Sequence, residues 1–259
     1  MARVTLLTDF GTRDGYVGAL KGVIAASVPG AVLDDVSHDV PRGDVRSASY
    51  ALARYWRLYP EATVHLAVVD PGVGTARRPL ACEADGRLFV APDNGVLSRV
   101  LAATGRWRAV EIKDAASPVL ASDGASATFH GRDVFAPAAA FLATGGDLSA
   151  LGPPLEDPVR HEEPSPVRVA AGMRGVVVAV DLFGNLLTNL PGASLEGVDA
   201  AEVAARRVPV VRTYGDGSPG EIIALVSSDG RVEFAVRDGS AAAVLAAGPG
   251  TEVLVPISK

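Results

Sequence analysis

The chain has 259 residues, 48% hydrophobic and 21% charged, which suits one or two globular domains with a sizeable core. Lysine and arginine number 24 against 30 aspartates and glutamates, and this net charge of −6 argues against nucleic acid or an anionic membrane as the main partner. The single cysteine, Cys82, excludes an intramolecular disulfide. With 28 glycines and 18 prolines, the chain is expected to contain many defined loops, where functional sites concentrate.

The N-terminal segment MARVTLLTDFG does not have the pattern of a signal peptide, because its apolar run is short and an aspartate follows at once. No stretch of about 18 apolar residues is present, so no membrane span is predicted. We therefore expect a cytoplasmic protein.

Strand-like and helix-like segments alternate along the first half of the chain. The run RVTLLT is typical of a strand buried on both faces, and the segment after it carries apolar residues at helical spacing. Such alternation predicts an α/β domain, residues 1–151, built on a Rossmann-like, mostly parallel sheet. The predicted strands are 3–8, 31–36, 63–69, 79–83 and 88–91, and the predicted helices are 14–27, 45–58, 95–103 and 134–144.

The second half changes character. Residues 152–168 are dense in proline and acidic residues and are predicted to be a linker. Short strand-like runs separated by glycine turns follow, with no long helical pattern, and they predict a small C-terminal β-barrel domain over residues 169–259. The runs are 175–180, 208–212, 222–226, 231–236, 242–245 and 252–255.

Three aspartates stand where predicted strands end. Asp9 and Asp70 follow strands of the α/β half, and Asp181 follows the first strand of the β half. Ligands of open α/β sheets bind beyond the carboxyl ends of the strands, so Asp9 and Asp70 are predicted to face one crevice. The alternative is that each aspartate only caps the next helix or turn.

The segment DPGVGTARR, which begins at Asp70, is not a nucleotide loop. No Gly-Lys-Ser/Thr follows it, and the segment does not complete GxGxxG, because an arginine stands at the third glycine position. Its glycines predict a tight turn that brings Arg77 or Arg78 back to Asp70 in a bidentate pair. The alternative is a surface salt bridge contributing ~0–1 kcal/mol.

His130 stands in TFHGRD, just before an alanine-rich predicted helix. A lone histidine is more often structural than catalytic. With four histidines and one cysteine no zinc site is expected, and the absence of GxSxG disfavours a serine hydrolase. The residues alone thus predict an α/β crevice with Asp, Arg and His, and leave the substrate open.

Five motifs carry a family resemblance. In chain order they are LLTDFGTRDGYVGALKG, VVDPGVGTARR, APDNGVLS, TFHGRDVFAPAAA and DLFGNLLTNL. Together they resemble the S-adenosyl-L-methionine (SAM) hydroxide adenosyltransferases, which are related to the bacterial fluorinase and chlorinase. The resemblance runs from residue 4 to about residue 255. It implies an α/β domain and a β-barrel, assembled as a homotrimer with SAM bound between subunits.

The resemblance also implies roles for individual residues. Asp70, Arg77 and His130 match the set that handles the nucleophilic water, and Asp9 matches the carboxylate that binds the ribose hydroxyls. Asn185 matches the amide that recognises adenine. The other implied substrate contacts are Ala241 (backbone, to adenine), Asp181 and Ser228 (methionine amino and carboxyl groups), and Phe129 and Phe183 (apolar walls).

The implied reaction is hydrolysis of SAM to adenosine and L-methionine by in-line attack of water or hydroxide on C5′, with no metal and no cofactor. Arg77 and a protonated His130 would favour hydroxide, while Asp70 orients the pair or accepts the proton. A chlorinase-like 5′-halogenase and a non-catalytic SAM- or adenosine-binding regulator remain as alternatives. The complete Asp–Arg–His set favours the hydrolase, and Gly131, where the fluorinase has a serine, disfavours fluoride more than chloride. The preferred sulfonium epimer of SAM stays open.

Overall fold

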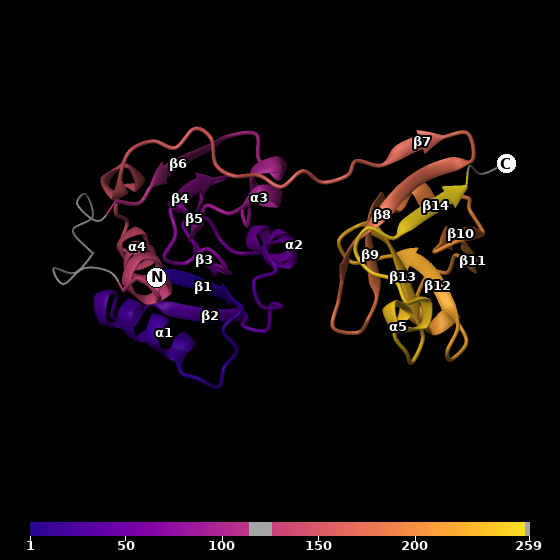
Figure 1. Cartoon of the computed structure of the whole chain (residues 1–259), viewed down its shortest axis with the longest axis horizontal. Coiled ribbons are helices and arrows are strands. Elements are labelled where there is room, and N and C mark those ends of the chain that lie inside the picture. The colour runs from indigo at the N-terminus through magenta and orange to yellow at the C-terminus, as the bar shows by residue number, and fades with distance from the viewer. Residues whose placement is uncertain (114–125, 257–259) are drawn as a thin grey trace. The chain divides into compact units, whose positions relative to one another are not determined.

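The computed structural model describes residues 1–113 and 126–256, which form two compact units, Met1–His161 and Glu162–Lys259 (Figure 1). The first unit is an α/β domain and the second a barrel-like antiparallel β-domain. The fold class predicted from the sequence is therefore confirmed. Among the described residues, no helix is both long and apolar enough to cross a membrane.

The first unit is built on a six-stranded sheet in the order β2-β1-β3-β5-β4-β6. The β1–β2, β1–β3 and β3–β5 pairs are parallel, whereas β4 is antiparallel to both β5 and β6, so five of the six strands run in one direction. β6 was not predicted. The strands are β1 (Arg3–Thr8), β2 (Val32–Ser37), β3 (Val64–Val68), β4 (Pro79–Ala84), β5 (Arg87–Pro92) and β6 (Trp107–Glu111).

Helices cover both faces of this sheet. Alternate residues of β1 point to opposite faces, so Val4 and Leu6 belong to the core under α1 and α4, whereas Leu7 belongs to the core under α2 and α3. The helices are α1 (Tyr16–Ser27), α2 (Val45–Tyr55), α3 (Ser98–Ala103) and α4 (Ala136–Ala143), with short 3₁₀ turns at Trp56–Leu58 and Leu148–Leu151.

Helices α1 and α2 each differ from the prediction at one end, and the local backbone explains each difference. α1 begins at Tyr16 rather than 14 because Gly15 has a left-handed backbone, φ 78°. α2 begins as predicted, after Asp44, whose carboxylate accepts a hydrogen bond from the Ser47 amide at 3.0 Å. Its predicted last turn is a 3₁₀ turn instead.

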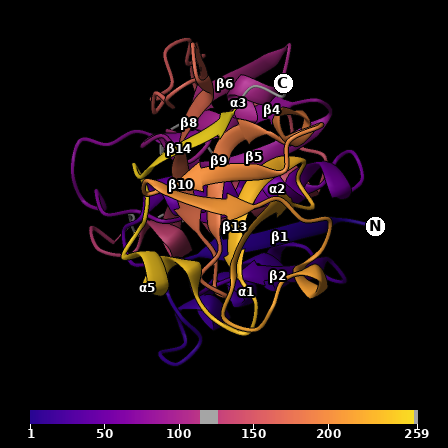
Figure 2. The ribbon, with the colours of Figure 1, turned by 90° about the vertical axis from the view of Figure 1, so that its right-hand side faces the viewer.

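The second unit is an antiparallel sheet in the order β11-β10-β14-β8-β9-β13-β12, with β7 paired to β8. β8 pairs with β14 through its first half and with β9 through its second half (Figure 2). A bridge between Val210 and Ala224 nearly closes the sheet. The strands are β7 (Val167–Val169), β8 (Gly172–Val180), β9 (Leu186–Pro191), β10 (Ala200–Val203), β11 (Arg206–Pro209), β12 (Ile222–Val226), β13 (Arg231–Val236) and β14 (Glu252–Pro256).

One prediction in this half was wrong. Residues 242–245 were predicted to be a strand but belong to a helix, α5 (Ala241–Leu245). Its N-terminus is capped by the Ser240 hydroxyl, which accepts from the Ala243 amide at 3.1 Å, and the following alanines favour helix. β7, β9 and β10 were missed. In β9 the buried polar side chains Thr188 and Asn189 interrupt the apolar pattern.

Part of the connecting segment between the units is hydrogen-bonded to the first unit. The Glu111 amide donates to the Pro153 carbonyl at 3.0 Å, and the Leu155 amide donates to the Ala109 carbonyl at 2.8 Å. These residues therefore lie along β6 and belong to the first unit.

The buried histidine His65 makes the stability of the first unit depend on pH. It is fully buried in β3, with Nδ1 2.8 Å from the Thr5 hydroxyl and its ring stacked on Phe89 at 5.0 Å between centroids. Burial lowers the pKa of His65 from 6.5 to about 3. Between these values the unfolded chain binds a proton and the folded chain does not, so stability falls as pH falls below 6.5.

We predict that the free energy of unfolding decreases by up to about 1.4 kcal/mol per pH unit between pH 6 and pH 4 through His65. The variant His65→Gln should be less stable at pH 7 and have a shallower pH slope. Urea unfolding followed by tryptophan fluorescence measures this, because both tryptophans, Trp56 and Trp107, lie in the first unit. Equal slopes in the two proteins would contradict the assignment.

Candidate active site

The loop 69–78 connects β3 to β4 at the carboxyl edge of the sheet, where α/β proteins bind ligands. Two turns fold it: the Val73 amide donates to the Asp70 carbonyl at 3.3 Å and the Thr75 amide to the Gly72 carbonyl at 3.1 Å. Gly74 has φ +77°, and a Cβ there would lie 2.6 Å from the Ala127 carbonyl oxygen, so only glycine fits. The loop therefore doubles back onto its own beginning.

This path brings Arg77 onto Asp70. Arg77 Nε donates to Asp70 Oδ1 at 3.1 Å and Nη2 donates to Oδ2 at 2.5 Å. The two side chains are only 7% and 6% exposed, so this is a buried bidentate pair rather than a surface salt bridge. Phe135 covers the guanidinium, with Cζ 5.2 Å from the ring centroid. Of the two arginines left open by the sequence, it is Arg77 that pairs with Asp70.

His130 completes the cluster. Its Nδ1 lies 3.0 Å from Arg77 Nη2. A guanidinium only donates hydrogen bonds, so Nδ1 accepts and the ring proton is on Nε2. The geometry of this contact is that of a neutral imidazole.

The electrostatics of the cluster are set by burial. Desolvation raises the pKa of Asp70 above its ordinary value of 3.8, although Arg77 and the Gly72 amide oppose the shift. Arg77 Nη1 is buried and has no hydrogen-bond partner among the residues that the structure describes. A buried donor without a partner is costly, and its presence beside a carboxylate of raised pKa marks a place for a polar ligand atom.

The segment around His130 is locally unusual. Gly131–Phe135 forms a turn of π-helix before α4, a feature frequent at functional sites. A Cβ on Gly131 would lie 3.1 Å from the Phe129 ring and 3.3 Å from the Phe10 ring, so a larger residue would crowd these rings.

Phe129 belongs to an aromatic cluster that the sequence only partly revealed. Its ring centroid is 5.2 Å from that of Tyr16 and 6.0 Å from that of Phe10, in edge-to-face geometry. Phe10 and Tyr16 were not predicted as site residues. The signal was their position in the glycine-rich segment DFGTRDGY that follows β1.

Asp9 follows β1 and lines a cavity of about 460 Å³. Its Oδ2 accepts a hydrogen bond from the Gly43 amide at 2.8 Å, which fixes the carboxylate against the segment after β2. Asp70, Arg77 and His130 are not among the lining residues. The cavity is lined by Asp9, Phe10, Gly11, Arg13, Asp14, His38, Asp39, Val40, Pro41 and Arg42.

In the second unit, Asp181 organises the loop between β8 and β9. Its Oδ1 accepts from the Phe183 and Asn185 amides, both at 2.9 Å, and its Oδ2 accepts from Asn185 Nδ2 at 3.0 Å. Asp181 thus does cap a turn, and by doing so it also fixes the Asn185 amide. Phe183 is 76% exposed at the loop tip.

This loop packs on the start of α5. The Ala242 amide donates to the Gly184 carbonyl at 2.9 Å, and a Cβ on Gly184, φ +81°, would lie 2.0 Å from the Ser240 hydroxyl. The structure therefore brings the Asp181 loop and buried Ala241 together.

Ser228 lies elsewhere in the same unit. It is in the turn between β12 and β13, next to the end of β9 where Pro191 pairs with Arg231. Asn185 precedes the opposite end of β9, where Leu186 pairs with Phe234. The length of the strand, ~20 Å for six residues, separates the two ends.

Within residues 1–113 and 126–256, no group of three or more His, Cys, Asp or Glu side chains is arranged to hold a metal ion.

Two family models match the chain. Residues 4–152 match the SAM hydroxide adenosyltransferase N-terminal domain, and residues 175–254 match the SAM hydroxide adenosyltransferase C-terminal domain. Together these matches span both structural units.

Known proteins resemble it over nearly the full length. A protein of Salinispora tropica named (R)-S-adenosyl-L-methionine hydrolase is 45% identical, with 97% of each chain covered, and one of the same name from Thermus thermophilus is 44% identical, with 93% of this chain and 94% of the relative covered. A fluorinase of an Actinoplanes species is 28% identical over 90% of each chain. The crystal structure of an uncharacterized conserved protein from Thermotoga maritima superposes with a TM-score of 0.89 at 36% identity, covering 97% of this chain and 99% of that one.

Proposed function

The chain belongs to the SAM hydroxide adenosyltransferase family, and from this premise we propose that it is an enzyme that hydrolyses SAM to adenosine and L-methionine. The observation that carries the proposal is the buried cluster of Asp70, Arg77 and His130 at the carboxyl edge of the sheet. Such a cluster suits activation of a small polar nucleophile rather than binding alone.

The reaction is an in-line displacement at C5′ of SAM. The water oxygen forms a bond to C5′ while the C5′–S bond breaks, and both electrons of that bond stay on sulfur as neutral methionine leaves. The sulfonium is already a good leaving group, so no acid has to protonate it. The enzyme's task is therefore to orient the water and to remove its proton.

We assign the proton to Asp70. The lone pair on Nδ1 of neutral His130 is engaged by Arg77, so the imidazole has no free acceptor. Asp70 retains carboxylate lone pairs, and burial raises its pKa toward that of a useful base. The unpartnered Arg77 Nη1 is the donor that stabilises the developing hydroxide. His130 acts by fixing the guanidinium.

The substrate contacts follow the family resemblance. Asp9 binds the ribose hydroxyls, Asn185 and the Ala241 backbone bind adenine, and Asp181 binds the methionine amino group. Phe129 and Phe183 supply apolar walls. Ser228 stands about one strand length, ~20 Å, from Asp181, so one chain cannot present both residues to the amino and carboxyl groups of the same methionine, and we assign Ser228 no substrate contact. The reaction needs no metal and no cofactor. The relatives' name directs the proposal to the (R) epimer at sulfur.

The assembly is a cytoplasmic homotrimer with SAM bound between subunits. In support, the proposed substrate contacts are divided between the two compact units of the chain. The loop tip at Leu182 and Phe183 is also 99% and 76% exposed, as expected for apolar side chains that a neighbouring subunit covers.

We predict that the purified protein incubated with SAM in ¹⁸O-enriched water releases methionine and adenosine, with the label in the adenosine. The (R) epimer should react faster than the (S) epimer when the two are supplied separately. Chromatography with mass spectrometry measures both outcomes. Appearance of 5′-chloro-5′-deoxyadenosine in chloride buffer in place of labelled adenosine would favour the halogenase, and tight SAM binding without turnover would favour the regulator.

We predict that Asp70→Asn lowers kcat by ~10²–10⁴-fold with little change in KM, because it removes the base but keeps the shape. Since the base must be ionised, the wild-type kcat should fall as pH decreases through a pKa above 3.8. Asp9→Asn is the matched control and should instead raise KM. Steady-state kinetics across pH measure the two effects, and equal losses of affinity in both variants would contradict the assigned roles.

We predict that two inactive variants complement each other when assembled together. Asp70→Ala disables the first unit and Asn185→Ala the second, so co-expressed chains should form some interfaces with both residues intact and regain activity. Differently tagged chains purified through both tags provide the sample, and light scattering gives its mass. Absence of recovered activity, or a monomeric mass, would contradict a site shared between subunits.

A further inference from the structure

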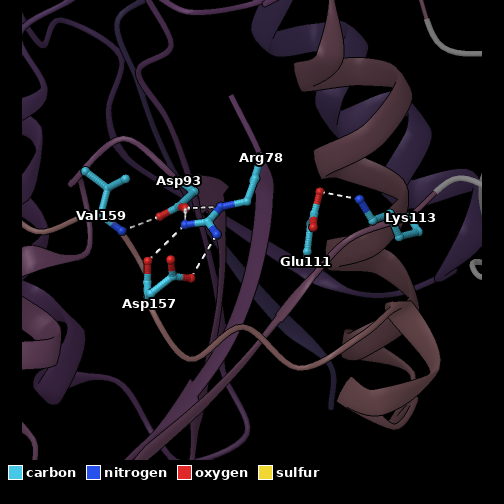
Figure 3. A network of polar contacts seen from close by, with 6 residues as sticks. All are labelled: Arg78, Asp93, Glu111, Lys113, Asp157 and Val159. Carbon is cyan, nitrogen blue, oxygen red and sulfur yellow. Dashed lines mark hydrogen bonds and ion pairs between the residues drawn. The ribbon is translucent and has the colours of Figure 1, made fainter. Parts of the chain in front are cut away.

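Two arginines that are adjacent in the sequence have different partners. Arg77 binds Asp70, whereas the Arg78 guanidinium lies between Asp93 and Asp157 (Figure 3). Nε donates to Asp93 Oδ2 at 2.8 Å, Nη1 donates to Asp157 Oδ1 at 2.9 Å, and Nη2 donates to the Asp157 carbonyl at 2.9 Å. Arg78 therefore links the loop that carries Asp70 to two other segments of the first unit.

Asp93 is the buried centre of this network. Its side chain is 1% exposed and follows the end of β5. Oδ2 accepts from Arg78, and Oδ1 accepts from the Val159 amide at 2.7 Å (Figure 3). One oxygen of the Asp93 carboxylate thus binds the loop 69–78, which we call the catalytic loop, and the other binds the connecting segment. Neither oxygen is left without a partner.

Asp93 and Asn94, which follow β5, also bind the backbone at both ends of the catalytic loop. The Asp93 amide donates to the Arg78 carbonyl at 2.9 Å, and Asn94 Nδ2 donates to the Val69 carbonyl at 2.8 Å. Val69 and Arg78 are the first and last residues of the loop 69–78. Asp70 and Arg77 therefore stand one residue inside the two points at which the loop is fixed.

The connecting segment contacts the rest of the first unit as far as His161, the last residue of that unit. The His161 amide donates to the Ser98 hydroxyl at 2.8 Å, and a Cβ on Gly95 would lie 2.5 Å from the His161 ring. The second unit begins at the next residue. The network of Arg78, Asp93 and Asp157 thus couples the catalytic loop to the segment that leads into the barrel.

We infer that Arg78 is a positioning residue for the hydrolysis: through Asp93 and Asp157 it holds the loop in the form that keeps Arg77 on Asp70. This inference rests on the proposed function and adds a residue that acts through Asp93 and Asp157 rather than at the reacting atoms. Arg77 and Arg78 are adjacent in the chain, so the contacts that fix Arg78 also limit where the Arg77 side chain can point. A displacement of about 1 Å at a reacting group costs on the order of 10²-fold in rate.

The test compares Arg78→Gln and Arg78→Lys with the wild type. Arg78→Gln should lower kcat on the order of ten- to a hundred-fold with KM within about twofold, because substrate contacts are untouched. Arg78→Lys keeps a charge for Asp93 but not the fork, so it should restore part of kcat. If Arg78→Gln does not fold, the kcat and KM of Arg78→Lys provide the test instead. Unchanged kcat in the variants, or equal changes in kcat and KM, would overturn the inference.

The matched control is Arg108→Gln. Arg108 pairs with Glu83 across β4 and β6 of the same sheet, with Nε 2.6 Å from Oε2, but its side chain is 63% exposed and is far in sequence from the catalytic loop. This variant should leave kcat unchanged. If it lowers kcat as much as Arg78→Gln, a general loss of stability explains both and the inference fails.

Amide hydrogen exchange separates this inference from the proposed function. The Val73 and Thr75 amides are bonded inside the loop, so Arg78→Gln should accelerate their exchange, whereas Arg108→Gln should not. This readout does not depend on turnover. Adenosine release by the wild type without faster exchange in Arg78→Gln would overturn the positioning role alone, and faster exchange without adenosine release would overturn the proposed function alone.

Discussion

The buried ion pair between Asp70 and Arg77 is the interaction on which the site depends. Taking both charges out of water costs several kcal/mol per ion, and only close, bidentate geometry offsets that cost. The loop supplies this geometry through Gly74, whose left-handed backbone fits against the Ala127 carbonyl. Removing either partner would leave an uncompensated buried charge, a loss of about 3–5 kcal/mol.

The ion pair between Asp70 and Arg77 also positions the neighbouring His130. Because Arg77 donates to both Asp70 and His130, one guanidinium group fixes the orientation of the carboxylate and of the imidazole. Burial raises the pKa of Asp70, and Phe135 covers the guanidinium that binds it. The proposed proton transfer therefore depends on the position of one guanidinium group. A dry, apolar surrounding suits a displacement in which the positive charge of the substrate is lost.

Much of the fold followed from local pattern. β1, β12 and β13 begin and end where the apolar runs predicted, because strands with continuous or alternating apolar residues and glycine turns at their ends are strongly specified. The pattern failed at α5, where a serine cap and an alanine run outweighed the surrounding strands, and at β9, where two consecutive buried polar side chains interrupt the apolar pattern. Thr188, for example, donates its hydroxyl to the Val232 carbonyl, a partner that no local pattern indicates.

By itself, the sequence determined the α/β-then-β architecture, the aspartates at strand ends and the family, because these depend on residue types and short spacings. Only the tertiary structure decided which arginine meets Asp70, which tautomer His130 adopts, and that Ser228 and Asn185 stand at opposite ends of one strand. The same holds for Phe10, Tyr16 and the Arg78 network. These outcomes depend on contacts between segments tens of residues apart, whose geometry is set by packing of the whole domain rather than by any local preference.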